Sequence, residues 1–269
     1  MTVRSGHRPE QARSFDAWAV DYDRYRPGYP DELFATISRA LDLPVRPEVA
    51  DLGAGTGRAT LAMARRGWRV TAIEPGAAML DPLRRAADAE RLGVTVRQAT
   101  AEETGLADAS VDLVTAAQAF HWFDRPRAVV EMGRIVRRGG GAAMFWNVRD
   151  DESSPFLAAY TDLLQRYVPG YEPGAREMRG RPVATRGELA STGAFEPPEF
   201  VQLPHEMRMD ADRFIGLAFT SSYVRVRMDH AEQARFRDEL AALIARHHGD
   251  APFSVPYQID LWIARRRSA

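Results

Sequence analysis

The chain has 269 residues, and its 36 basic and 37 acidic side chains nearly cancel to a formal net charge of −1. It contains no cysteine and no lysine, so every basic side chain is an arginine, which excludes thiol nucleophiles, zinc–thiolate sites, iron–sulfur clusters, Schiff-base lysines and the lysine of a phosphate-binding loop. The balanced charge argues against a nucleic-acid-binding protein, which usually concentrates its basic side chains on one face.

The first 13 residues are polar and lack the apolar core of a signal peptide. Along the rest of the chain, no apolar run approaches the roughly 18 residues that span a bilayer. We therefore expect a cytoplasmic protein that acts on a small-molecule substrate, without a membrane or nucleic-acid partner. The sequence does not decide its oligomeric state.

Between residues 48 and 147, short β-rich runs alternate with longer amphipathic runs. The pattern predicts strands at residues 49–52, 69–74, 94–99, 111–116 and 141–147. It predicts helices between them, including residues 58–66, 77–91 and 125–136. Such alternation is typical of an α/β fold in which helices cover both faces of a parallel sheet.

After residue 150 the regular alternation stops. Residues 151–204 are rich in Pro, Gly and Glu, and we expect one helix there, at 156–167. A further helix is expected at 231–247 and a strand at 257–264. No linker separates the two halves, so we expect this part to cover the sheet and return to it, not to form a second domain.

The most informative stretch runs from Val49 through Asp51, Gly53 and Gly55 to Gly57, where a β-rich run ends in a turn of alternating glycines. Glycines permit positive φ and allow backbone N–H groups to approach a ligand closely. The next predicted strand ends in Glu74, whose carboxylate can accept hydrogen bonds from two ribose hydroxyls. Both features lie at the carboxyl edge of the predicted sheet, where open α/β folds bind ligands.

The spacing of the glycines distinguishes two classes of cofactor. A dinucleotide fingerprint would require a third glycine at position 58, which is occupied by Arg58. The acidic Asp51 at the strand end instead suits a ligand that carries an ammonium group, as an amino-acid nucleoside does. A nicotinamide reductase is therefore disfavoured.

At this point the chain resembles the class I S-adenosylmethionine-dependent methyltransferases. The resemblance is carried by residues 51–57, Glu74-Pro75, residues 99–102 and residues 110–114. Residues 15–30, 118–123 and 145–150 are similar to the branch that includes trans-aconitate methyltransferase. The resemblance covers most of residues 14–150 and, more weakly, the closing stretch to Arg266.

The resemblance implies a Rossmann-like, doubly wound α/β fold, with a mostly parallel sheet of seven strands, a helical cover and an N-terminal cap segment. It implies a single methyltransferase domain over residues 1–269. Within it we expect a cap at 1–47, a cofactor-binding core at 48–150, a cover insertion at 151–255 and a closing strand at 256–269.

The resemblance also implies S-adenosyl-L-methionine as cofactor and S-adenosyl-L-homocysteine as product. Residues of the glycine turn would line the methionine and ribose portions, and Glu74 would hold the ribose hydroxyls. Arg26 would pair with the cofactor's carboxylate. The full set of implied cofactor residues is Tyr25, Arg26, Asp51, Gly53, Ala54, Gly55, Gly57, Glu74, Pro75, Met79, Thr100, Ala101, Glu102 and Gln118. Thr100 replaces the acidic residue that is common in the family at the adenine amino edge.

His121, just past the fourth predicted strand, is placed to act as a general base, since its ordinary pKa of about 6.5 suits removal of a hydroxyl proton. The alternative is that His121 only orients the acceptor, because a carboxylate acceptor needs no base. Trp122 and Trp146 are predicted to wall an acceptor pocket, although a core position is an equal alternative for Trp146. Tyr223 and Tyr257 are further substrate candidates. No metal site is expected.

The favoured hypothesis is therefore a small-molecule methyltransferase that methylates an oxygen, either a hydroxyl or a carboxylate. The sequence leaves two alternatives open. One is an enzyme of this fold that binds the cofactor but catalyses a non-methylating reaction such as cyclisation. The other is a cofactor-binding subunit without activity of its own.

Overall fold

The structure is a computed structural model that describes residues 25–151, 153–171 and 181–267. The predicted cap motif before Tyr25 therefore lies outside the described residues. Within these ranges, no helix combines the length and the apolar character needed to cross a membrane.

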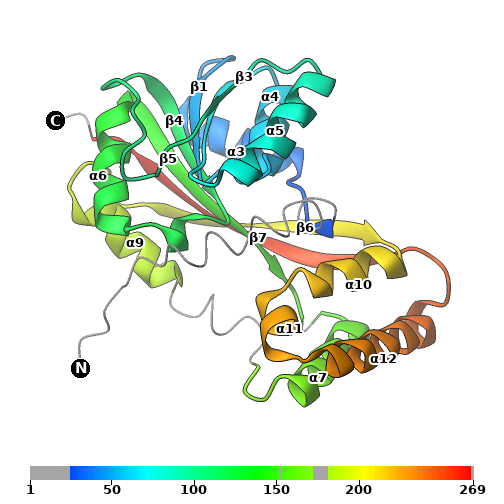
Figure 1. Cartoon of the computed structure of the whole chain (residues 1–269). Coiled ribbons are helices and arrows are strands. Elements are labelled where there is room, and N and C mark those ends of the chain that lie inside the picture. Colours follow the sequence, from blue (N-terminus) through cyan, green and yellow to red (C-terminus); the bar gives the residue numbers. More distant parts are fainter. Residues whose placement is uncertain (1–24, 152, 172–180, 268–269) are drawn as a thin grey trace.

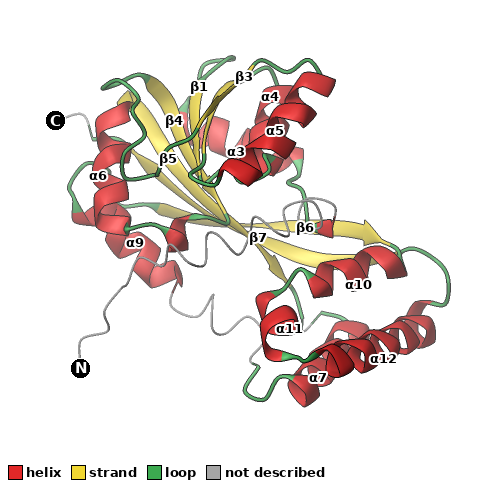
Figure 2. Ribbon diagram, in the orientation of Figure 1, coloured by secondary structure: helices red, strands yellow, loops and turns green. Residues whose placement is uncertain are grey.

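One sheet of seven strands forms the centre of the molecule (Figure 2). Its spatial order is β3-β2-β1-β4-β5-β7-β6. The first five strands of this order are parallel, and β7 runs antiparallel to both β5 and β6. The predicted Rossmann-like, mostly parallel sheet is confirmed. The strands are β1 (Glu48–Leu52), β2 (Arg69–Ile73), β3 (Val94–Arg97), β4 (Val111–Ala117), β5 (Val136–Arg149), β6 (Glu199–Met209) and β7 (Phe253–Arg265).

The central strands follow the buried apolar runs that the sequence pattern located. Strand β4 is buried over most of its length, as expected for a strand covered on both faces. Strand β5 is longer than predicted at both ends: Val136 pairs with Val111 of β4, and the pairing with β7 continues to Arg149. This extension carries its carboxyl end beyond the layer of the shorter parallel strands.

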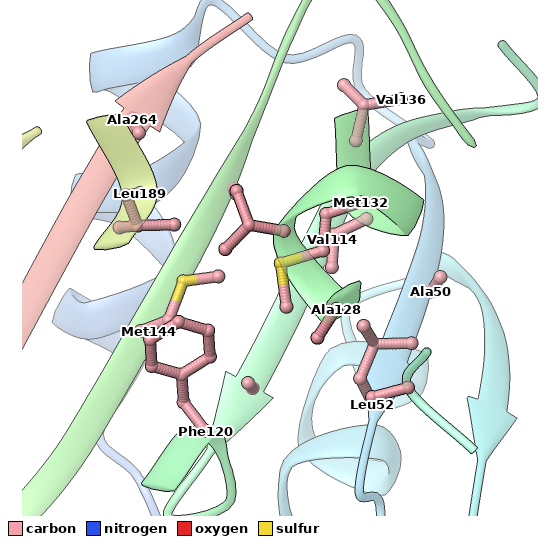
Figure 3. Close-up of a cluster of buried hydrophobic side chains, with 14 of the residues drawn as sticks. Ala50, Leu52, Val114, Phe120, Ala128, Met132, Val136, Met144, Leu189 and Ala264 are labelled. Atoms are coloured by element: carbon pink, nitrogen blue, oxygen red, sulfur yellow. The ribbon is translucent and has the colours of Figure 1, made fainter. Parts of the chain in front are cut away.

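Helices cover the two faces of the parallel part of the sheet (Figure 1). One face carries α3 (Asp31–Leu41), α4 (Arg58–Arg65) and α5 (Ala77–Ala89), and the other carries α6 (Arg125–Ile135) and α9 (Arg181–Ser191). Figure 3 shows the second layer, in which Met132 of α6 and Leu189 of α9 pack over Val114 and Met144. A short 3₁₀ helix, η1 (Phe120–Trp122), follows β4.

A separate layer of helices packs at the far ends of β6 and β7 (Figure 1). Its members are α7 (Pro155–Tyr167), α10 (Ala211–Phe219), α11 (Ser222–Arg227) and α12 (His230–His248). Phe253 and Val255 of β7 and Met209 of β6 complete its apolar core. These helices correspond to the predicted cover, and we call them the cover helices.

The sequence analysis did not predict β6, which lies inside the expected cover segment and forms the edge of the sheet. Its side chains alternate in exposure, as in a strand with one buried face. Pro204 in the middle of this strand obscured the pattern, because proline is tolerated only at edges and bulges of sheets. The helices α3, α9, α10 and α11 were also missed.

Asp51 lies in the core of the sheet and not at its ligand-binding edge. Its side chain is 1% exposed, and its two oxygens accept hydrogen bonds from Thr60 Oγ1 at 2.6 Å and Thr115 Oγ1 at 2.8 Å. Burial raises the pKa of Asp51 to about 6, although the two hydroxyls favour the charged form. The prediction that its carboxylate meets a ligand's ammonium group is therefore wrong: the side chain joins β1 to α4 and β4.

Close packing requires a glycine at position 57, the last glycine of the turn after β1. Gly57 has a φ of 94°, and a Cβ at this position would lie 2.7 Å from Cγ of the buried Leu83 in α5. The absence of a side chain thus allows α5 to pack against the start of α4. Gly67, with a φ of 80°, has open space around the same position.

We predict that Gly57→Ala destabilises the protein more than Gly67→Ala does. Both substitutions introduce a left-handed non-glycine residue, at a cost of about 1–2 kcal/mol. Only Gly57→Ala also forces Leu83 to move, which adds about 1–3 kcal/mol of overpacking. Urea unfolding of the two variants measures the difference, and equal losses would contradict the close packing of α5.

We predict that the stability of the wild type relative to Asp51→Asn depends on pH. The unfolded carboxyl ionises near pH 3.8 and the folded one near pH 6, so the wild type loses stability as the pH rises through this window. The expected relative loss between about pH 3.5 and about pH 7.5 is about 3 kcal/mol, since each pKa unit corresponds to about 1.4 kcal/mol. Urea unfolding at both pH values tests this. A constant difference would show that the buried carboxylate carries no desolvation penalty.

Candidate functional site

The glycine turn folds back onto the end of β2. The N–H groups of Gly53 and Ala54 donate to the Ile73 carbonyl at 2.8 and 3.1 Å, and that of Gly57 donates to Ala54 at 2.9 Å. The Gly55 N–H donates to Glu74 Oε2 at 3.0 Å. These four amides are satisfied within the protein, so the prediction that they reach a ligand is wrong. The turn offers a ligand its open backbone surface instead.

Glu74 connects this turn with the helix that follows. Its Oε2 accepts from Gly55, and its Oε1 accepts from the Gly76 N–H at 2.9 Å, just before α5. The side chain is therefore held rigidly at the strand tip by two backbone hydrogen bonds.

The glycine turn is open on the side of Gly55, next to Glu74. Gly55 has a φ of 57°, and a Cβ at this position would meet no atom within 4 Å. On the other side of the turn, a Cβ on Gly53 would lie 2.6 Å from Ala119 Cβ and 3.2 Å from the Phe123 ring. The turn is thus closed toward η1 and open at Gly55. Open space beside an anchored carboxylate is what a ribose with two hydroxyls requires.

The residues implied for the adenine side have several structural partners. Met79 is buried in α5, the Pro75 carbonyl accepts from Gln98 Nε2 at 3.1 Å, and Ala101 is 3% exposed. Glu102 Oε1 accepts from the Asp124 N–H at 2.7 Å, at the start of α6. The structure thus uses the Glu102 carboxylate to anchor a helix. An open recess of about 570 Å³ beyond β3 includes Thr100, but no other predicted site residue lines it.

Gln118 lies directly after β4 in a left-handed conformation, with a φ of 57°. Its N–H donates to the Phe145 carbonyl at 2.9 Å, and its side-chain Nε2 donates to the Asn147 carbonyl at 3.3 Å. These bonds tie the tip of β4 to β5. A non-glycine residue held at positive φ is uncommon and marks a constrained position.

Residues 25–30 cross from the sheet to the cover helices. Asn147 Nδ2 donates to the Gly28 carbonyl at 3.1 Å, and Arg26 Nη2 donates to the Thr220 carbonyl, at the end of α10, at 3.4 Å. The Tyr25 ring lies against Gly216 of α10, where a Cβ would come within 2.4 Å of it. The structure thus places Tyr25 and Arg26 against α10.

His121 and Trp146 are brought together at the carboxyl edge. The indole Nε1 of Trp146 donates to His121 Nδ1 at 3.4 Å. Trp146 itself is 2% exposed and packs in the core beneath α6 and α9. The prediction that its ring walls an acceptor pocket is therefore wrong, whereas its N–H reaches the predicted site. Trp122, by contrast, is 49% exposed.

The structure also assembles polar residues that the sequence analysis missed. Arg149, Asp151, Tyr160 and Tyr171 lie together with the predicted Tyr223 and Tyr257. Arg149 ends β5, so the rule that selected His121, a polar residue at the carboxyl end of a strand, could have selected it as well. Tyr160 gave no such signal, because it lies on the apolar face of α7 between Phe156 and Leu164.

Comparisons with known proteins agree with this architecture. Residues 50–144 match the family model of a methyltransferase domain. An uncharacterized methyltransferase of Mycobacterium tuberculosis is 43% identical over 145 residues, which is 54% of this chain and 56% of that protein. The chain thus spans little more than half the length of this curated relative.

Two solved structures extend the likeness. A protein described as a type II methyltransferase from Anaeromyxobacter dehalogenans is 30% identical, with a TM-score of 0.66 over 90% of this chain and 98% of that one. A phosphoethanolamine N-methyltransferase of Haemonchus contortus, in complex with S-adenosylhomocysteine, is 15% identical, with a TM-score of 0.55 over 100% of this chain and 62% of that one. This second likeness concerns the fold alone.

The family model falls on the strands that carry the glycine turn and Glu74, and the Anaeromyxobacter structure is matched over nearly its whole length. The chain therefore belongs to the class I S-adenosylmethionine-dependent methyltransferase family.

Proposed function

We propose that this protein transfers the methyl group of S-adenosylmethionine to an oxygen atom of a small molecule. The observation that carries the proposal is the Glu74 carboxylate, held by Gly55 and Gly76 beside the open side of the glycine turn. Membership of the methyltransferase family supports the choice of cofactor. The nearly neutral charge supports a small acceptor over a nucleic acid, and we infer a cytoplasmic location from the composition.

The cofactor, when bound, supplies a sulfonium whose methyl group is already activated for transfer. The chain's residues then have to bind, align and exclude water. Glu74 would accept hydrogen bonds from the ribose hydroxyls. Because the turn amides are satisfied internally, the turn would offer its carbonyl oxygens to the ammonium group of the methionine portion.

The contact between Trp146 and His121 supports an orienting role for the histidine. An indole N–H can only donate, so His121 Nδ1 must accept, and the neutral ring then carries its hydrogen on Nε2. In this tautomer, Nε2 is a hydrogen-bond donor and cannot remove a proton. We therefore favour His121 as a donor that orients the acceptor, over the base role.

We predict that Glu74→Ala weakens the binding of S-adenosylhomocysteine by about 1–3 kcal/mol, because charge-assisted hydrogen bonds to the ribose are lost. Isothermal titration calorimetry measures the change. Glu74→Gln is the matched control, since the amide oxygen retains part of the accepting capacity and the shape is unchanged. An unaltered dissociation constant in the alanine variant would contradict the assignment of this carboxylate.

We predict that His121→Gln retains most of the methyl-transfer activity, whereas His121→Ala lowers kcat/KM by about tenfold, the cost of one lost hydrogen bond to substrate. Glutamine keeps an N–H donor but cannot act as a base. The assay uses labelled cofactor and an acceptor found by label uptake from a metabolite screen.

The pH profile provides a second criterion for His121. A donor role predicts equal acid limbs in the wild type and in His121→Gln. If the glutamine variant is as inactive as the alanine variant and lacks the acid limb of the wild type, the histidine is a base.

A further inference from the structure

Six polar residues meet between the end of β5 and the cover helices. We call Arg149, Asp151, Tyr160, Tyr171, Tyr223 and Tyr257 the arginine–tyrosine cluster. Arg149 pairs with Tyr257 across β5 and β7 and lies two residues after Asn147, whose carbonyl accepts from Gln118. The Arg149 guanidinium lies over the ring of Tyr160 in α7, and it also interacts electrostatically with Tyr223 in α11. The cluster therefore adjoins the carboxyl edge of the sheet.

The cluster is organised around one ion pair. Arg149 donates through Nε to Asp151 Oδ1 and through Nη2 to Asp151 Oδ2. The guanidinium carbon lies 4.7 Å from the centre of the Tyr160 ring, in cation–π geometry. The rings of Tyr171 and Tyr223 lie 5.0 Å apart. The guanidinium is therefore held in a fixed orientation.

Much of the cluster's donor capacity is left unused. A guanidinium has five N–H groups, and the Asp151 pair uses two of them. The other three have no hydrogen-bond partner among the described residues. Nor do the hydroxyls of Tyr160, which is 1% exposed, and Tyr257, which is 6% exposed, have one there. None of these donor atoms is among the fully buried, unpaired side-chain atoms of the described residues. They are therefore within reach of solvent, and a ligand can pair with them.

The character of the donors limits the chemistry of the ligand. Burial raises the pKa of both Tyr160 and Tyr257, so the phenols remain protonated and can donate. Arg26, whose charge also acts on Tyr257, adds a second guanidinium on the Tyr257 side of the cluster. A cationic ligand would be repelled, and an apolar one would leave the donors unpaired. A group that only accepts hydrogen bonds and carries negative charge matches the cluster.

We propose that the arginine–tyrosine cluster binds an oxyanion of the methyl acceptor, a carboxylate or a phosphate, with Arg149 and the Tyr160 hydroxyl as its donors. Asp151 is a positioning residue that orients the guanidinium. This inference rests on the proposed function for the identity of the ligand as acceptor. The presence of an oxyanion site in the protein can be tested without turnover.

The first experiment titrates the full chain with benzoate, phenyl phosphate and benzamide, in the presence and absence of S-adenosylhomocysteine, by calorimetry. Benzamide has the shape of benzoate without its charge. We expect at least one of the two anions to bind at least about tenfold more tightly than benzamide, because a charge-assisted hydrogen bond increases affinity by about this factor. The comparison of the two anions distinguishes a carboxylate site from a phosphate site. Equal binding of all three probes, or no binding of any, overturns the proposal.

The second experiment places the site. Tyr160→Phe removes a hydroxyl that has no described partner, so the fold should be retained, and anion affinity should fall about fivefold or more. Tyr167→Phe is the matched control on the same helix, because the Tyr167 hydroxyl donates to Glu239 at 2.6 Å away from the cluster. Arg149→Gln should abolish anion binding. Unchanged anion affinity in Tyr160→Phe, or an equal fall in Tyr167→Phe, overturns the assignment.

The experiments can refute the oxyanion site and the proposed function independently of each other. If S-adenosylhomocysteine does not bind but the anions bind in a Tyr160-dependent manner, the oxyanion site stands and the proposed function is wrong. If S-adenosylhomocysteine binds and the anions do not, the oxyanion site is wrong and the proposed function stands.

Discussion

The geometry at the carboxyl edge of the sheet depends on the two backbone hydrogen bonds that Glu74 accepts. Its two carboxylate oxygens accept backbone hydrogen bonds from Gly55 and Gly76, one on each side of the tip of β2. These bonds fix the glycine turn relative to α5 and, at the same time, fix the carboxylate itself. The open face of the turn and the acceptor oxygens of the side chain therefore keep one relative position. Under the proposed function, an edge with this rigidity would bind the nucleoside of the cofactor without rearrangement.

The fold of residues 48–149 could be predicted from the sequence, because local patterns of apolar residues and glycines determine its strands, helices and turns. The alternation of strands and helices located β1 to β5 within a few residues. The glycines and Glu74 predicted the sheet edge at which the proposed cofactor site lies. The pattern could not predict which backbone amides and side chains point into the protein and which point toward a ligand. The turn amides and Asp51 are satisfied inside the protein, since the turn itself, the end of β2, α4 and β4 supply their partners. Trp146 faces the core for the same reason.

The cover and the edge of the sheet were less predictable. Strand β6 is stabilised by its pairing with β7 along eleven positions, and an edge strand with polar and proline residues has little local signal. The arginine–tyrosine cluster draws its members from β5, α7, α11, β7 and the intervening loops. Only the tertiary fold assembles them, so no spacing rule could have revealed the group in advance.

The length of β5 has a consequence for how such a protein can diversify. One half of this strand lies among the short parallel strands that hold the glycine turn in place, and its last residues reach the helices that supply tyrosines. Substitutions in α7 or α11 alter the chemistry around Arg149 without touching Glu74 or its backbone partners. Under the proposed function, a lineage could exchange one acceptor for another through these helices alone, while the residues proposed to hold the methyl donor are inherited unchanged.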